Sequence, residues 1–147
     1  MAEAPDPMHS PNKSERALIS GRVTTGIGEG ARFTQLPWIR KAFVALLDID
    51  PFPGTLNLKI EETDVMRQWH ELKARSGSVL LPPPDTEFCR ARCYPVLVEG
   101  RLRAAIVCPE VRDYPKDQIE LIAAVSIRKT LSLKDGDRLS LEVDEPN

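Results

Sequence analysis

Three glycines at alternate positions mark the first segment of the chain that could do chemistry. They occur in Gly26-Ile27-Gly28-Glu29-Gly30-Ala31, directly after an expected strand. Glycine places no Cβ between the backbone N–H groups and a ligand, and successive N–H groups that face one way bind phosphate oxygens. The segment also fits the G-x-G-x-x-A pattern of dinucleotide-binding proteins, but no helix is expected to begin at its last glycine, so we reject that interpretation. Two hypotheses stay open: a phosphate-binding loop and a glycine-rich bend at the corner of a barrel.

A hydroxyl and an amide follow Pro53-Gly54, in Thr55-Leu56-Asn57. Because residues i and i+2 of a strand face the same side, Thr55 and Asn57 are expected to project together. Their oxygens are hard ligands that suit Mg²⁺, provided that phosphates supply the negative charge. The alternative is that Pro53-Gly54 only turns the chain and the polar pair faces water, and the spacing alone favours this alternative.

A third candidate segment lies between residues 112 and 128. Apolar residues at helical spacing predict a short helix over residues 118–125, with Glu120 on it and Arg128 near its C-terminal end. Asp117 and Glu120 have the spacing of a capping pair, which would give Glu120 a purely structural role. Arg128 would then be a cation that stabilises the end of the helix.

The composition is that of one globular domain and excludes several classes of function. The chain has 147 residues, of which 41% are hydrophobic, and 20 Lys and Arg stand against 22 Asp and Glu. A net charge of −2 argues against a nucleic-acid-binding protein. No apolar run reaches the ~20 residues of a membrane span, and no signal peptide is evident. The cysteines at 89, 93 and 108 match no metal-ligand spacing, so we expect reduced thiols and a cytoplasmic protein.

The elements that must position these residues are mostly strands. Alternating or apolar runs predict strands at residues 18–23, 55–60, 93–98, 103–107 and 138–143, and a helix begins at Pro37. Glu99-Gly100 and residues 134–137 are expected turns, and residues 61–84 are expected to be irregular with one strand. Residues 17–143 form the single expected domain, between a disordered leader (1–16) and a frayed tail (144–147). About six strands and two short helices predict a mainly β fold, a small closed or semi-closed barrel.

Taken together, these segments resemble the archaeal-type CTP-dependent riboflavin kinase family. The resemblance covers residues 17–143, and its most specific part is the combination of the G-x-G-E-G loop with the P-G-T-L-N motif at residues 53–57. It also includes Leu36-Pro37-Trp38, Ala105-Ile106-Val107, the region of residues 119–128 and Leu133-Lys134-Asp135-Gly136-Asp137.

The resemblance implies a six-stranded closed cradle-loop (RIFT-type) barrel that transfers the γ-phosphoryl group of CTP to the 5′-hydroxyl of riboflavin, giving FMN and CDP. It implies that Thr55 and Asn57 hold one Mg²⁺ ion. Glu120 would contact the ribityl chain and orient or deprotonate the attacking hydroxyl. Arg112 stands about where the family can have a small hydroxyl residue near the FMN phosphate, and a guanidinium can also bind phosphate. The residues implied to line the nucleotide are Gly26, Ile27, Gly28, Glu29, Gly30, Ala31, Val125, Ser126, Ile127 and Arg128.

Two other functions remain as alternatives at this point. One is a non-catalytic barrel that binds a flavin or a nucleotide as a sensor or regulator. The other is a CTP-dependent kinase of a different small alcohol. In each case we expect a monomer or small homo-oligomer without nucleic-acid or membrane partners.

Overall fold

The computed structural model describes residues 17–25, 36–75, 79–81, 91–110 and 114–143. The expectations for the leader, the tail, the glycine segment 26–31 and Arg112 lie outside these residues. The elements in chain order are β1 (Ala17–Thr24), α3 (Pro37–Leu47), β2 (Leu56–Lys59), α4 (Thr63–Arg75), β3 (Val79–Leu81), β4 (Ala91–Val98), β5 (Leu102–Pro109), β6 (Gln118–Ile122), α5 (Ile127–Thr130) and β7 (Arg138–Val143).

Six of the strands close into an antiparallel barrel, as expected. The hydrogen-bonded order is β3-β4-β5-β6-β2-β1-β7, and a further pairing of β4 with β7 joins the two ends. In that pairing Val96 lies opposite Val143 and Val98 opposite Leu141. The short strand β3 pairs with β4 outside the closed ring. Closure leaves these six strands without free edges on which another chain could pair.

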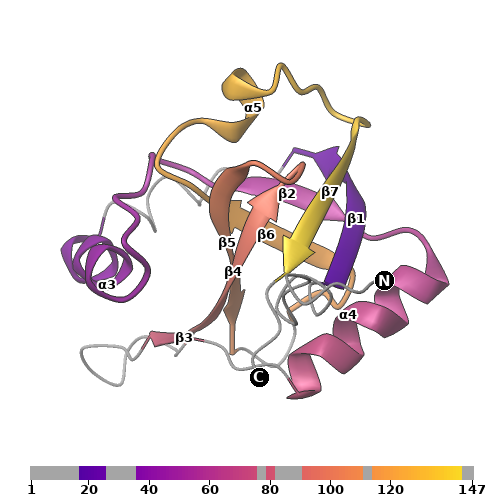
Figure 1. Ribbon diagram of the computed structural model, residues 1–147, viewed down its shortest axis with the longest axis horizontal. Helices are drawn as coiled ribbons and strands as arrows, with labels where there is room; N and C mark the ends of the chain where they lie inside the picture. The colour runs from indigo at the N-terminus through magenta and orange to yellow at the C-terminus, as the bar shows by residue number, and fades with distance from the viewer. Residues whose placement is uncertain (1–16, 26–35, 76–78, 82–90, 111–113, 144–147) are drawn as a thin grey trace, which may run out of the picture.

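The alternation of side chains along the strands produces two cores. Inward-facing residues such as Ile19, Leu58, Ile106 and Leu121 fill the barrel, where Trp69 and Leu72 of α4 join them. The outward-facing residues of β4, β5 and β6 form a second core with α3, including Ile39, Phe43, Ala105, Val107 and Ile122. Figure 1 shows α3 and α4 on different sides of the barrel and α5 at one end.

The helix expected after Pro37 is confirmed as α3, with proline in its first turn. Proline suits this position because the first N–H groups of a helix have no partner within it. The helix ends at Asp48, which has a left-handed backbone (φ 57°). At the same end, the Arg103 guanidinium of β5 donates to the Leu47 carbonyl over 3.0 Å. The carboxyl end of α3 is therefore tied directly to the barrel wall.

Two predictions of secondary structure are wrong. Residues 118–122 form strand β6 and not part of a helix over 118–125, because pairing with β2 and β5 on both sides requires an extended chain. Residues 63–75, expected to be irregular, form α4, whose apolar residues Val65, Trp69 and Leu72 recur at helical spacing. None of the helices in the described parts of the chain is long and apolar enough to cross a lipid bilayer.

The hairpin between β4 and β5 is confirmed and gives a first prediction. Both turn residues have positive φ, 53° at Glu99 and 72° at Gly100, as a tight turn between twisted strands requires. Gly100→Ala is expected to lower the free energy of unfolding by about 1–2 kcal/mol, because alanine is strained in this conformation. The added Cβ would also stand 2.8 Å from the Glu142 carboxylate, which must move. Urea denaturation measures the change, with Arg101→Ala as the control. Equal stability of the two variants would contradict the prediction.

Candidate functional site

The polar candidate residues in and beside β2 and β6 lie close together on the outer surface of the barrel. Asn57 of β2 lies directly opposite Glu120 of β6 in the antiparallel pairing, and opposite Thr24 of β1 on its other side. The Thr55 hydroxyl, two residues before Asn57, lies 3.4 Å from Oε1 of Glu120. Directly opposite residues of antiparallel strands share a face. The Thr55 hydroxyl just before β2, the Asn57 amide of β2 and the Glu120 carboxylate of β6 are therefore neighbours.

The position of Glu120 rules out the capping role. Since β6 is a strand, Asp117 and Glu120 do not stand in the first turn of a helix, and the capping pair is wrong. Arg128 does not close a helix over residues 118–125 either, because it lies within the separate short helix α5. Glu120 is half-buried and faces outward, while its neighbours Ile119 and Leu121 point into the barrel core.

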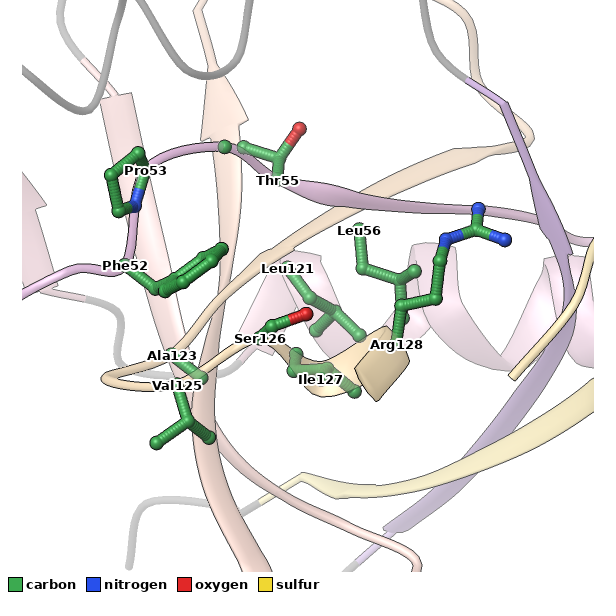
Figure 2. Close-up of a pocket in the computed structure, with 11 residues that line it drawn as sticks. Phe52, Pro53, Thr55, Leu56, Leu121, Ala123, Val125, Ser126, Ile127 and Arg128 are labelled. Atoms are coloured by element: carbon green, nitrogen blue, oxygen red, sulfur yellow. The ribbon is translucent and has the colours of Figure 1, made fainter. Parts of the chain in front are cut away.

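A pocket lies beside this group of polar residues. It has a volume of about 160 Å³ and is bounded by the segments that lead into β2 and out of β6. Figure 2 shows Phe52 and Val125 at one end of the pocket and Arg128 at the other. The Phe52 N–H donates to the Ala123 carbonyl over 2.8 Å and so holds the two segments together. The residues that line it are Phe52, Pro53, Gly54, Thr55, Leu56, Leu121, Ala123, Val125, Ser126, Ile127 and Arg128.

Of the ten residues expected to line a nucleotide, the four at 125–128 belong to this pocket, and the six at 26–31 lie outside the described residues. Ser126 begins α5, and its hydroxyl accepts a hydrogen bond from the Lys129 N–H over 3.2 Å. Ile127 is buried in the barrel core and anchors the segment. Val125 is 43% exposed and Phe52 42% exposed, so two apolar side chains are accessible at one end of the pocket. The pocket therefore combines an apolar end with a cationic one.

A network of polar contacts joins Arg128 to the end of β1. The Arg128 guanidinium lies 2.9 Å from one oxygen of Asp135, and the Thr25 hydroxyl donates to the other. Both contacts, the one with Thr25 foremost, hold the pKa of Asp135 below its usual value. Thr25 immediately precedes the glycine segment 26–31. Asp135 thus links a pocket residue to the point where that segment begins.

Two residues near Glu120 were not identified from the sequence. The Tyr114 hydroxyl donates to Oε2 of Glu120 over 2.7 Å, and the Gln118 amide lies 3.4 Å from the same oxygen. Burial first, and then the hydrogen bond to Glu120, raise the pKa of Tyr114, so the phenol stays protonated and donates. The sequence contained a signal for Gln118. Polar and apolar residues alternate over 118–121, which places Gln118 and Glu120 on one face of a strand.

The described cysteines lack the chemistry of a nucleophile. Burial raises the pKa of Cys93 to about 12 and that of Cys108 to about 11. A thiol reacts as the thiolate, so these two groups stay unreactive near neutral pH.

The cap of α5 gives a second prediction. Ser126→Ala is expected to lower the free energy of unfolding by about 1 kcal/mol, because the Lys129 N–H loses its acceptor. Chemical denaturation measures the loss. Lys129→Ala is the matched control, since it keeps the backbone N–H that Ser126 caps. Unchanged stability of Ser126→Ala would show that the side chain of Ser126 does not stabilise the helix.

The chain is similar to known proteins over most of its length. Residues 23–143 match the family model CTP-dep_RFKase, described as a domain of unknown function, DUF120. The chain is 36% identical to a riboflavin kinase of Methanosarcina barkeri, over 85% of this chain and 56% of the relative. It is 39% identical to one of Methanosarcina acetivorans, over 85% of this chain and 53% of the relative. A riboflavin kinase of Sulfolobus acidocaldarius is 32% identical, over 89% of this chain and 84% of the relative.

The chain thus spans little more than half the length of the two Methanosarcina relatives and most of the Sulfolobus one. The family match runs from the end of β1 to the last residue of β7 and so includes every described element of the site. The chain therefore belongs to the CTP-dependent riboflavin kinase family.

Proposed function

We propose that this protein is a riboflavin kinase that uses CTP and releases FMN and CDP. The observation that carries the proposal is the grouping of Thr55, Asn57 and Glu120 beside the pocket of residues 125–128. The relatives named above are riboflavin kinases, and the family name specifies CTP. Phosphoryl transfer asks a protein mainly to position its substrates and neutralise their charge, and these residues suit both tasks.

The nucleotide would occupy the pocket and extend from it. A volume of about 160 Å³ suits one portion of a nucleotide, since whole small-molecule sites measure about 300–1,000 Å³. The exposed faces of Phe52 and Val125 would contact the base, and Arg128 would lie at the other end of the pocket. Backbone N–H groups of residues 26–31 would bind phosphate oxygens, as their sequence predicts.

The oxygen donors at the start of β2 fit a magnesium ion. Thr55, directly before β2, offers a hydroxyl and Asn57 of β2 an amide oxygen, and both lie beside the Glu120 carboxylate. These two donors are neutral, so the phosphates of CTP would supply the negative charge that Mg²⁺ needs. The bound ion would neutralise charge on the transferred phosphoryl group.

Glu120 would act on the acceptor. The 5′-hydroxyl oxygen of riboflavin forms the new bond to the γ-phosphorus, the bond from that phosphorus to the CDP oxygen breaks, and the hydroxyl proton leaves. A carboxylate within hydrogen-bonding reach of that hydroxyl would orient it and accept the proton. Arg112 would bind the phosphate of the product FMN through paired N–H donors.

The decisive assay combines the purified protein with riboflavin, Mg²⁺ and either CTP or ATP, and follows FMN by chromatography. The expected result is FMN with CTP. No FMN with any nucleotide would exclude the proposal. Stabilisation against heat by both ligands without turnover would instead favour a non-catalytic binding protein. Stabilisation by CTP with no effect of riboflavin would indicate a kinase of another small alcohol.

The proposal extends to the partners and the place of action. The substrates are riboflavin and CTP, with no nucleic acid or membrane involved, and the protein acts as a monomer or small homo-oligomer. It works in the cytoplasm, where nucleoside triphosphates are available.

A further inference from the structure

We infer that Tyr114 is a positioning residue that holds the Glu120 carboxylate in the orientation used for phosphoryl transfer. The inference rests on the proposed function, since it assigns to Tyr114 a role that is exercised only through Glu120.

The two oxygens of the Glu120 carboxylate have different surroundings. Oε2 accepts the short hydrogen bond of 2.7 Å from the Tyr114 phenol, and the Gln118 amide stands 3.4 Å from it. Among the residues that the structure describes, Oε1 faces the Thr55 hydroxyl at 3.4 Å, which is beyond the usual O–H···O distance. Oε2 is therefore the anchored oxygen, and Oε1, on the side of Thr55 and the pocket, is the one left to meet the acceptor hydroxyl.

The chain around Tyr114 supports this arrangement. The Gln118 N–H donates to the Pro115 carbonyl over 3.3 Å, which turns the chain just before β6. The turn brings the half-buried Tyr114 beside the face of β6 that carries Gln118 and Glu120. The Gln118 amide also lies 3.4 Å from the Tyr114 oxygen, so the three polar groups form one cluster.

Anchoring matters because a glutamate side chain is flexible. Free rotation about its side-chain bonds would distribute the carboxylate among several positions. A hydrogen bond that fixes the carboxylate in advance removes the entropic cost of ordering it from the activation free energy. A misplacement of 1 Å can lower a rate by about a hundredfold. The raised pKa of Tyr114 keeps its proton available for the anchor throughout the neutral range.

The test uses the only two tyrosines of the chain. Tyr114→Phe keeps the ring and removes the hydroxyl, and it is expected to lower kcat by about ten- to a hundredfold. The KM for CTP should stay within about twofold and the melting temperature within a few degrees, because the ring still fills its site. Tyr94→Phe is the control: Tyr94 packs edge-on against Trp69 in the barrel core, and its variant should keep the wild-type kcat.

A double variant separates positioning from general damage. If Tyr114 acts through Glu120, then Tyr114→Phe should cost nothing further in a Glu120→Ala background, where no carboxylate is left for the phenol to hold. If the double variant lost kcat by the product of the two single losses, the inference would be overturned. Wild-type kcat in Tyr114→Phe would overturn it as well. Wild-type protein assayed alongside keeps the two proposals apart. Absence of FMN from it would refute the proposed function, whereas equal rates from wild type and Tyr114→Phe would refute the positioning role alone.

Discussion

Replacing Asn57 by alanine is expected to lower kcat about a thousandfold or more while the barrel stays folded. In the proposed reaction Asn57 supplies one of two protein oxygens to the magnesium ion, and charge neutralisation by such an ion is worth several kcal/mol in the transition state. The side chain is only half-buried and lies outside both apolar cores, so the melting temperature should change by no more than a few degrees.

The measurement is FMN formation at saturating CTP over a range of Mg²⁺ concentrations. The stabilisation of the protein against heat by CTP with Mg²⁺ should weaken in parallel, which gives a readout besides turnover. Lys59→Ala is the matched control, since Lys59 lies two residues along β2 on the same face and pairs with Gln118. Wild-type turnover in Asn57→Ala would count against the assignment of the metal ligands.

The second large effect is expected from Glu120→Gln. Glutamine keeps the length of the side chain and an oxygen that can accept from Tyr114, but it cannot take a proton from the acceptor hydroxyl. A general base typically raises the rate by about 10²- to 10⁴-fold. Because a loose transition state needs little removal of the proton, we expect a loss of rate near the lower end of this range. We therefore expect kcat to fall about a hundredfold with an unchanged fold.

Steady-state kinetics with riboflavin and CTP would measure this loss, together with a thermal melt of the same sample. Glu71→Gln removes an exposed carboxylate from α4 and serves as the control. A destabilised Glu120→Gln variant with normal kcat would assign Glu120 a structural role in the wall between β2 and β6, and would remove it from the reaction.

The strands that alternate regularly were predictable, and the reason is local. β1 and β7 carry their inward residues at every second position. The β4–β5 hairpin needs only Glu99 and Gly100 to adopt positive φ in its turn. These features depend on neighbours in the chain. The same holds for α3, whose first turn accommodates Pro37.

The segment 118–125 shows where local patterns fail. Ile119, Ile122 and Ala123 have helical spacing, but polar and apolar residues also alternate over 118–121. The pattern of this short segment therefore fits both a helix and a strand. The strands on either side decide between them, because β2 and β5 both pair with this segment. β2 lies far away in the chain and β5 also lies outside the segment, so no local pattern contains both partners.

For this protein the sequence by itself determined the mainly β class, the resemblance carried by the glycine segment and the P-G-T-L-N motif, and the identity of Thr55, Asn57 and Glu120 as candidates. Only the tertiary structure decided that Glu120 lies opposite Asn57, that Thr55 touches its carboxylate, and that Tyr114 holds its other oxygen. The physical reason is that residue type and spacing are local properties. The register of two strands, by contrast, is set by closure of the whole barrel and by the cores packed on both sides of its wall.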